Sequence, residues 1–129
     1  MKKPTLLIVD DDTKLLRMLK EDLEDDFTIK TASSVSEALL KIKGSDVILT
    51  DYELGSNTGL DLALSHQAKA LNSKFVFMSK NINKLEKSLA ERNMNETAVW
   101  KGDYGIEEWT KILLDTVEKQ NTVEQQQKR

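Results

Sequence analysis

Short, mainly apolar runs alternate along the chain with longer stretches in which apolar residues recur at helical spacing. Four of the short runs are almost wholly apolar, as expected of strands that are covered on both faces, and another alternates apolar with polar residues. In chain order, the predicted strands span residues 6–9, 27–32, 47–50, 75–78 and 97–100. A helical stripe follows each strand, so the chain consists of five successive β–α units.

The helical stripes also carry residues suited to helix ends. The stripes lie at residues 15–23, 35–42, 60–71, 82–94 and 106–117. Asp12 or Thr13 can cap the first helix, the pair Ser33 and Ser34 can begin the second, and Gly44 can end it. Because crossovers between parallel strands are nearly always right-handed, we predict an α/β fold with a doubly wound, five-stranded parallel sheet (flavodoxin-like, order 2-1-3-4-5) and five helices.

Length, composition and charge narrow the class of protein. The 129 residues suffice for one domain, which we assign to residues 1–118, and residues 119–129 are expected to form a polar C-terminal tail or a linker stub. The absence of cysteine excludes disulfides and thiolate metal sites and fits a cytoplasmic location. No apolar stretch is long enough to span a membrane, and the net charge of -3 argues against direct nucleic-acid binding.

Polar residues follow or close four of the predicted strands. Asp10 and Asp11 follow the first strand, Asp51 follows the third, Ser79 closes the fourth and Lys101 closes the fifth. The carboxyl ends of parallel strands share one edge of the sheet, which is where ligands bind in folds of this class. We therefore expect clustered carboxylates, one hydroxyl and one ammonium at that edge.

Such a cluster suits a divalent cation and a phosphoryl group. Carboxylates gathered at one point repel each other unless they share protons or hold a cation. Oxygen ligands suit Mg²⁺, Mn²⁺ or Ca²⁺, and Mg²⁺ commonly accepts phosphate oxygens as well. A carboxylate at such a site can attack phosphorus and become an aspartyl phosphate, while Lys101 neutralises one phosphoryl oxygen and Ser79 donates a hydrogen bond to another.

These features, in this order, resemble the receiver domain of bacterial two-component response regulators. The matching pieces are the acidic run in LLIVDDD, the aspartate in VILTDYEL, the following Gly59, the serine in FVFMS and the lysine in AVWK. They extend over residues 4–117, which is close to the whole chain. The resemblance is to a single-domain, chemotaxis-regulator-like receiver.

The resemblance implies a role for each acid of the cluster. Asp51 would be the phosphoacceptor. Asp10 and Asp11 would be the acidic pair, and with Asp51 they would form a site for Mg²⁺, or alternatively Mn²⁺. The backbone carbonyl of Glu53 would complete the metal site, and its side chain could change the rate of aspartyl-phosphate hydrolysis.

The resemblance also implies partners and a switch. Ser79 would be the hydroxyl switch and Lys101 the lysine of the family. The phosphoryl donor would be a sensor histidine kinase or a histidine phosphotransfer protein. Phosphorylation would draw Ser79 inward and reshape the surface of the fourth helix, fifth strand and fifth helix, where a downstream protein target binds. The domain would be a monomer or weak dimer and no conventional enzyme, since it would catalyse only its own phosphotransfer and slow hydrolysis.

Three positions depart from the family pattern. Gly102 follows the lysine where a proline in a cis peptide is usual, and glycine makes a bend without locking it. Ala98 takes the place of the aromatic switch residue, so that Trp100, on the same strand face, or Tyr104 is a candidate to replace it. Lys80 follows the switch hydroxyl where a small residue is usual.

Other readings of the sequence lead to different expectations. A pseudo-receiver would bind partners without being phosphorylated, as the three departures suggest. A phosphatase of the haloacid dehalogenase kind also uses an aspartate after its first strand, but the threonine in residues 10–13 falls one position too early for its motif. Trp100 and Trp109, taken without the resemblance, are expected in the core.

Overall fold

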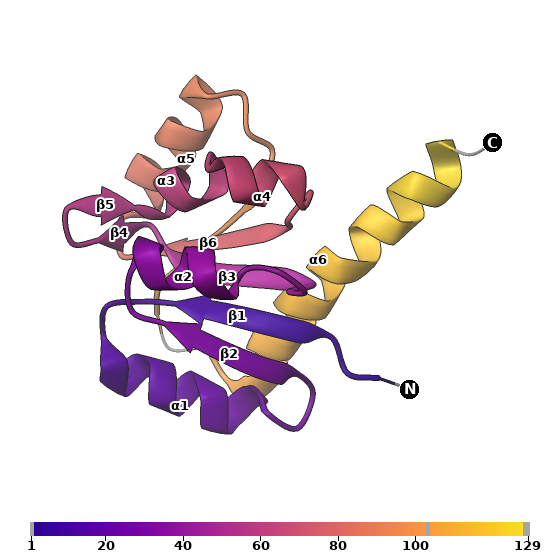
Figure 1. Ribbon diagram of the computed structural model, residues 1–129, viewed down its shortest axis with the longest axis horizontal. Coiled ribbons are helices and arrows are strands. Elements are labelled where there is room, and N and C mark those ends of the chain that lie inside the picture. The colour runs from indigo at the N-terminus through magenta and orange to yellow at the C-terminus, as the bar shows by residue number, and fades with distance from the viewer. Residues whose placement is uncertain (1, 103, 128–129) are drawn as a thin grey trace.

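A parallel sheet forms the centre of the protein (Figure 1). The computed structural model describes residues 2–102 and 104–127, with their side chains up to Glu118. The strands are β1 (Thr5–Val9), β2 (Thr28–Ala32), β3 (Val47–Asp51), β6 (Phe75–Ser79) and β7 (Thr97–Trp100). Their order is β2-β1-β3-β6-β7, and every pairing between them is parallel. The predicted fold and strand order are confirmed.

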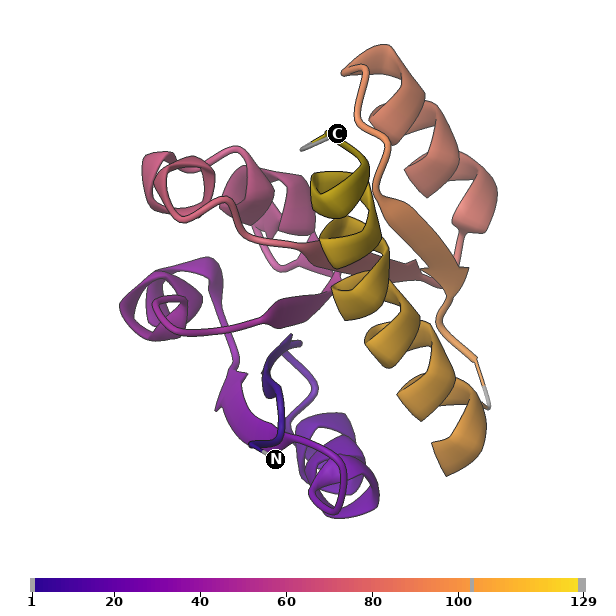
Figure 2. The same ribbon diagram turned by 90° about the vertical axis from the view of Figure 1, so that its right-hand side faces the viewer.

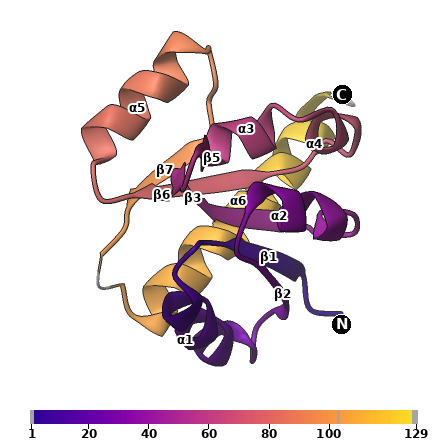
Figure 3. The ribbon, with the colours of Figure 1, turned by 60° about the vertical axis from the view of Figure 1, so that its left-hand side comes forward.

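Helices cover both faces of this sheet (Figure 3). The helices are α1 (Thr13–Leu23), α2 (Val35–Lys41), α3 (Gly59–Ala63), α4 (His66–Ala70), α5 (Ile82–Glu91) and α6 (Ile106–Gln127). Side chains of α1 and α6 pack into one apolar layer, and those of α2, α3, α4 and α5 pack into the other. Within the described residues, no helix combines the length and the apolar character needed to cross a membrane.

The central strand β1 shows why the apolar runs of the sequence are unbroken. Leu7 and Val9 belong to the apolar layer that includes Leu85 of α5, whereas Leu6 and Ile8 belong to the layer on the opposite face. The side chains of these four residues are fully buried. Because successive side chains of a strand point to opposite faces, a strand covered on both sides needs an apolar residue at every position.

The predicted N-caps of the first two helices are confirmed, whereas α2 ends at Lys41, before the predicted end at Gly44. The Asp12 carboxylate accepts hydrogen bonds from the backbone N–H groups of Lys14 and Leu15, at 3.1 and 3.2 Å. The Ser34 hydroxyl accepts one from the Glu37 N–H at 3.1 Å. These bonds satisfy backbone donors that the first helical turn leaves free. Asp12 is thereby engaged at the start of α1, next to the candidate acids.

The predicted third helix is two short helices in the structure, so the described chain has six helices. Ser65 separates α3 from α4 and has an extended conformation, with φ -63° and ψ 153°. Its hydroxyl donates to the Leu62 carbonyl at 2.6 Å and accepts from the Ala68 N–H at 3.1 Å. One serine therefore ends one helix and caps the next, and a continuous apolar stripe does not reveal such a break.

Two further elements differ from the expected pattern. Residues in the loop after β3 form an antiparallel hairpin of β4 (Glu53–Leu54) and β5 (Asn57–Thr58), with Gly55 at its turn in the left-handed region, φ 66°. The backbone of α6 continues past residue 117 as far as Gln127 (Figure 2). The assignment of residues 119–129 to a tail or linker stub stays a prediction.

We expect the two apolar layers to dominate the stability of this fold. Leu85→Ala removes a fully buried side chain of α5 and should lower the free energy of unfolding by about 2–5 kcal/mol. Leu40→Ala makes the same substitution on α2, where the side chain is 87% exposed, and should change it by less than about 0.5 kcal/mol. Urea denaturation of both variants measures the difference. Equal losses would contradict the assignment of Leu85 to the core.

Candidate active site

The acids that follow β1 and β3 converge at the carboxyl edge of the sheet. These strands are neighbours with Val9 opposite Thr50, so that Asp10 and Asp51 occupy adjacent strand ends. One carboxylate oxygen from each of Asp10, Asp11 and Asp51 lies within 4.8 Å of the others. Asp10 and Asp51 are buried, and Asp11 is exposed to solvent. The parallel pairing of the two strands therefore brings together acids that are forty residues apart in sequence.

Lys101 lies against two of these carboxylates. Its backbone N–H donates to the Ser79 carbonyl at 2.8 Å and so ties the chain just past β7 to the end of β6. Its Nζ donates a hydrogen bond to Asp51 Oδ2 at 2.8 Å and forms an ion pair with Asp10 Oδ2 at 2.8 Å. One ammonium group thus bridges acids from two different strands.

Burial and charge act against each other at this ion pair. Burial raises the pKa of Asp10 above its usual value, although Lys101 and a hydrogen bond from Asp12 favour the charged carboxylate. Burial also lowers the pKa of Lys101, but the hydrogen bonds and charges of Asp10 and Asp51 outweigh it and leave the pKa raised. Lys101 is therefore a permanent positive charge at neutral pH.

The oxygens that Lys101 leaves available determine whether the site can hold a metal. Asp10 Oδ1 accepts from the Asp12 N–H at 2.9 Å, and Asp51 Oδ1 accepts from the Glu53 N–H at 3.2 Å. Asp10 Oδ2 is buried and lies 2.8 Å from the Lys101 ammonium. Three carboxylates within 4.8 Å of one another, one of them open to solvent, fit a hard cation such as Mg²⁺.

A cleft of about 380 Å³ lies over this cluster. It is lined by Asp11, Asp12, Asp51, Glu53, Gly55, Lys80 and Lys101. The hairpin of β4 and β5 contributes Glu53 and Gly55, and the segment between β6 and α5 contributes Lys80. Glu53 is expected to change the rate of aspartyl-phosphate hydrolysis, and Lys80 departs from the family pattern. Both residues border the same space as the carboxylates.

Ser79 is not part of the cluster in this structure. Its hydroxyl accepts from the Asn81 N–H at 3.0 Å and donates to the Asn81 carbonyl at 3.1 Å. Asn81 is in turn the N-cap of α5 and accepts from the Lys84 N–H. The Ser79 hydroxyl is therefore engaged in the turn that begins α5, and it would have to rotate to reach a group on Asp51.

The aromatic residues near β7 occupy different environments. Trp109 is buried, as expected, and packs edge-on against Tyr104 with the ring centroids 4.8 Å apart. Trp100 is 53% exposed, so the expectation that it lies in the core is wrong. Trp100 is the last residue of β7, a strand at the edge of the sheet, where half of its surface has nothing to cover it. Ala98 packs against the apolar layer that includes α5.

Two neighbours of Asp51 help to shape the site, and the sequence pattern singled out only one of them, Gly59. The Tyr52 hydroxyl lies 2.9 Å from that of Ser88, which connects the residue after Asp51 to α5. A Cβ on Gly59 would lie 2.6 Å from the Asp51 carbonyl oxygen, so only glycine allows α3 to start this close to β3. The only sequence signal for a role of Tyr52 is that it is an aromatic residue directly after Asp51. A position in the core would explain such a residue equally well.

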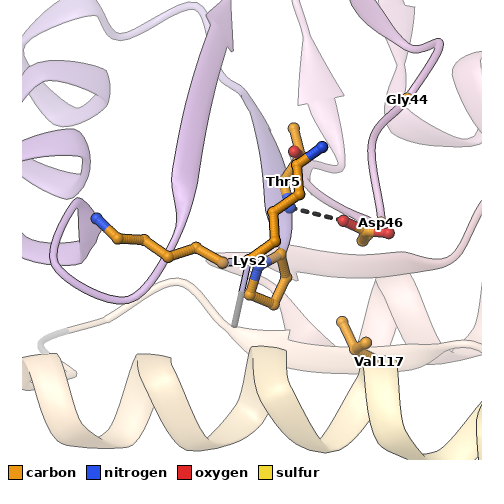
Figure 4. A pocket seen from close by; sticks show the side chains of 7 residues that line it. Lys2, Thr5, Gly44, Asp46 and Val117 are labelled. Carbon is orange, nitrogen blue, oxygen red and sulfur yellow. Dashed lines mark hydrogen bonds between the residues drawn. The ribbon is translucent and has the colours of Figure 1, made fainter.

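A second hollow of about 380 Å³ lies at the opposite, amino edge of the sheet (Figure 4). It is lined by residues 2–5, Gly44, Asp46 and Val117. The Asp46 carboxylate in this hollow accepts a hydrogen bond from the Thr5 backbone N–H at 2.7 Å, which anchors the start of β1. None of the residues selected from the sequence for chemistry lines it, so the candidate site is the cleft at the carboxyl edge.

This arrangement of fold and site is shared with a known family. The family model for the response regulator receiver domain matches residues 6–99, well over half of the chain. The chain belongs to the response regulator receiver domain family, the class of protein in two-component signalling that the sequence resembled. The matched segment ends at Val99 and therefore stops before Lys101, in the region where the sequence departs from the family pattern.

Individual relatives agree with this classification. The alginate biosynthesis transcriptional regulatory protein AlgB of Pseudomonas aeruginosa is 36% identical over 72 residues, which cover 54% of this chain but only 16% of that protein. A CheY-like receiver domain protein from Methanospirillum hungatei has a TM-score of 0.78 at 25% identity, covering 94% of this chain and 98% of that one. A CheY-like receiver domain from Methylobacillus flagellatus has a TM-score of 0.73 at 28% identity, covering 90% and 99%.

The raised pKa of Lys101 predicts a specific dependence of stability on pH. A lysine whose folded pKa exceeds its unfolded value contributes stability that is complete below the unfolded pKa, about 10.5, and is lost as pH rises through the folded pKa. Lys101→Met should therefore unfold more easily than the wild type by on the order of 1–3 kcal/mol at neutral pH. This difference should shrink above pH ~10.5.

Urea denaturation without divalent ions between neutral pH and pH ~11 measures this difference. Lys111→Met, on the exposed side of α6, is the matched control and should show neither the loss nor the pH dependence. A stability difference for Lys101→Met that stays constant across this range would contradict the ion pairs with Asp10 and Asp51.

Proposed function

We propose that this protein is a phosphorelay receiver that accepts a phosphoryl group on Asp51 in a Mg²⁺-dependent reaction. One observation carries the proposal. Asp51 is a buried carboxylate that lies within 4.8 Å of two further acids and 2.8 Å from the Lys101 ammonium. This set provides a nucleophile, ligands for a cation and a positive charge for the phosphoryl oxygens in one cleft.

The donor is a phosphohistidine on a sensor histidine kinase or a histidine phosphotransfer protein. An oxygen of the Asp51 carboxylate attacks phosphorus, the P–N bond to the imidazole breaks, and the imidazole leaves with its electron pair and takes up a proton. Asp10, Asp11, Asp51 and the backbone carbonyl of Glu53 would hold Mg²⁺, or Mn²⁺ in its place. When bound, the cation neutralises charge on the transferring group. Lys101 supplies a second positive charge, already aimed at Asp51.

The output of the reaction is a change at α5. The Ser79 hydroxyl leaves its turn with Asn81 and donates to the phosphoryl group, which alters the N-terminus of α5. The surface of α5, β7 and α6 then presents a new shape to a downstream protein target. Slow hydrolysis of the aspartyl phosphate resets it. A bacterial, cytoplasmic setting is part of the proposal, and the Pseudomonas aeruginosa relative supports the bacterial part.

A pseudo-receiver that binds partners without phosphorylation is the second candidate function. Lys101 already pairs with two of the carboxylates, and the Ser79 hydroxyl is engaged with the backbone of Asn81. A site that has no need of a cation would show the same two features. The phosphatase reading has no such support, because Asp12, which its motif needs as a second catalytic acid, is the N-cap of α1.

We expect phosphorylation of Asp51 by a small phosphodonor. The wild type incubated with Mg²⁺ and acetyl phosphate should gain the mass of one phosphoryl group, because the Lys101 ammonium is in place beside the Asp51 carboxylate. Asp51→Asn should gain none, and chelation of Mg²⁺ should abolish the gain. Intact-protein mass spectrometry measures all three. A mass gain that persists in Asp51→Asn would count against the assigned nucleophile.

Mg²⁺ should also stabilise the folded protein. At a free concentration ten times its Kd, an ion that binds only the native state adds about 1.4 kcal/mol, which raises Tm by roughly 5 °C in a chain of this size. Asp11→Asn should lose most of this shift. Asp12→Asn is the matched control, because asparagine caps a helix as well as aspartate does. Thermal melts with and without Mg²⁺ measure the shift, and its absence in the wild type would favour the pseudo-receiver.

A further inference from the structure

The indole of Trp100 packs directly on Gly102. The residue between them in the sequence is Lys101, whose ammonium lies in the candidate site. A Cβ built on Gly102 would lie 1.9 Å from Trp100 Cζ3 and 2.1 Å from Cε3, far inside any contact distance. The ring occupies the space that a side chain at position 102 would need, so a larger residue there would have to displace the indole. Trp100 remains 53% exposed, so this contact, and not burial in the core, accounts for the position of its ring.

The backbone beneath the ring makes a tight turn centred on Lys101. The Gly102 N–H donates to the Trp100 carbonyl at 3.0 Å, which closes a three-residue turn. Two residues further along the chain, the Tyr104 N–H donates to the Gly102 carbonyl at 3.0 Å. The turn is short, and a glycine has more conformational freedom than any other residue. The ring of Trp100 covers this most flexible point of the turn.

The turn matters because it directs the Lys101 side chain. The Lys101 backbone N–H is held by the Ser79 carbonyl, and its Nζ reaches Asp51 at 2.8 Å. A lysine side chain has four rotatable bonds, so its ammonium stays on one oxygen only if the backbone is held. The hydrogen bond to Ser79 holds one side of this residue, and the packing of Trp100 on Gly102 holds the other.

We propose that Trp100 is a positioning residue that clamps the turn at Lys101 through its packing on Gly102 and so keeps the ammonium on Asp51. The proposal rests on the proposed function, since it assigns to Trp100 an effect on phosphoryl transfer. It also assigns a function to Gly102, which follows Lys101. Gly102 alone does not fix the backbone turn at Lys101, but Gly102 with Trp100 packed on it does.

The test is a set of double-mutant cycles on the rate of phosphorylation by acetyl phosphate with Mg²⁺. Trp100→Ala should slow the wild-type reaction on the order of tenfold, because a small misplacement of a catalytic group has effects of this size or larger. In a Lys101→Ala background, the same substitution should change the rate by less than about twofold, because Trp100 acts through Lys101. Equal effects in the two backgrounds would overturn the proposal.

A second cycle tests the contact itself. Gly102→Ala should slow the wild type, because the new methyl group displaces the indole, but it should have a smaller effect in Trp100→Ala, where the space is free. Trp100→Phe should recover part of the rate by restoring a ring over the glycine. Ile106→Ala is the matched control, since it removes a comparably exposed apolar side chain from the start of α6, and it should leave the rate unchanged.

A stability measurement separates this proposal from the proposed function. Lys101→Met should lower Tm by a clearly smaller amount in Trp100→Ala than in the wild type, because the ion pairs are already weakened there. If the wild type is not phosphorylated, the proposed function fails. The coupling in Tm between Lys101→Met and Trp100→Ala then tests by itself whether Trp100 positions Lys101. Additive losses in Tm would overturn it. An effect of Trp100→Ala with a kinase donor but not with acetyl phosphate would also overturn it, since Trp100 would then contact a partner.

Discussion

The ion pairs of the Lys101 ammonium with Asp10 and Asp51 are the interaction on which this structure depends. A buried carboxylate without a partner is strongly unfavourable, and two side by side are worse. Lys101 makes it possible for both strand ends to place a carboxyl group in the same buried place. The hydrogen bond to Ser79 and the packing of Trp100 on Gly102 both act on the short segment that presents this ammonium.

The same interaction explains how acids from two strand ends can lie close together in the fold. With Lys101 in place, the cluster carries less negative charge, so the fold tolerates it without a cation. An incoming divalent ion adds positive charge beside Lys101, and a phosphoryl group adds the negative charge that offsets both. In the proposed function, the cation and the phosphoryl group would therefore favour each other's binding.

The path from the site to the surface runs through α5. Ser79 and Asn81 form the turn at its start, and Tyr52 contacts Ser88 along its length. Ala98, at the position of the family's aromatic switch, is too small to swing between two packings. The residue beside Asp51 thus contacts α5, the hydroxyl at the end of β6 contacts its N-cap, and neither link involves position 98.

The sequence by itself determined the two-sided burial and the identity of the chemical groups, because apolar periodicity and residues at strand ends are local signals. The strand order followed from the connection rules for successive β–α units. It indicated that Asp10, Asp11, Asp51 and Lys101 would share one edge, since parallel strands leave no alternative. Only the tertiary structure decided where each side chain points. The engagement of Ser79 in the α5 turn and the indole of Trp100 over Gly102 depend on contacts between backbone and side chains in three dimensions, which no periodicity encodes.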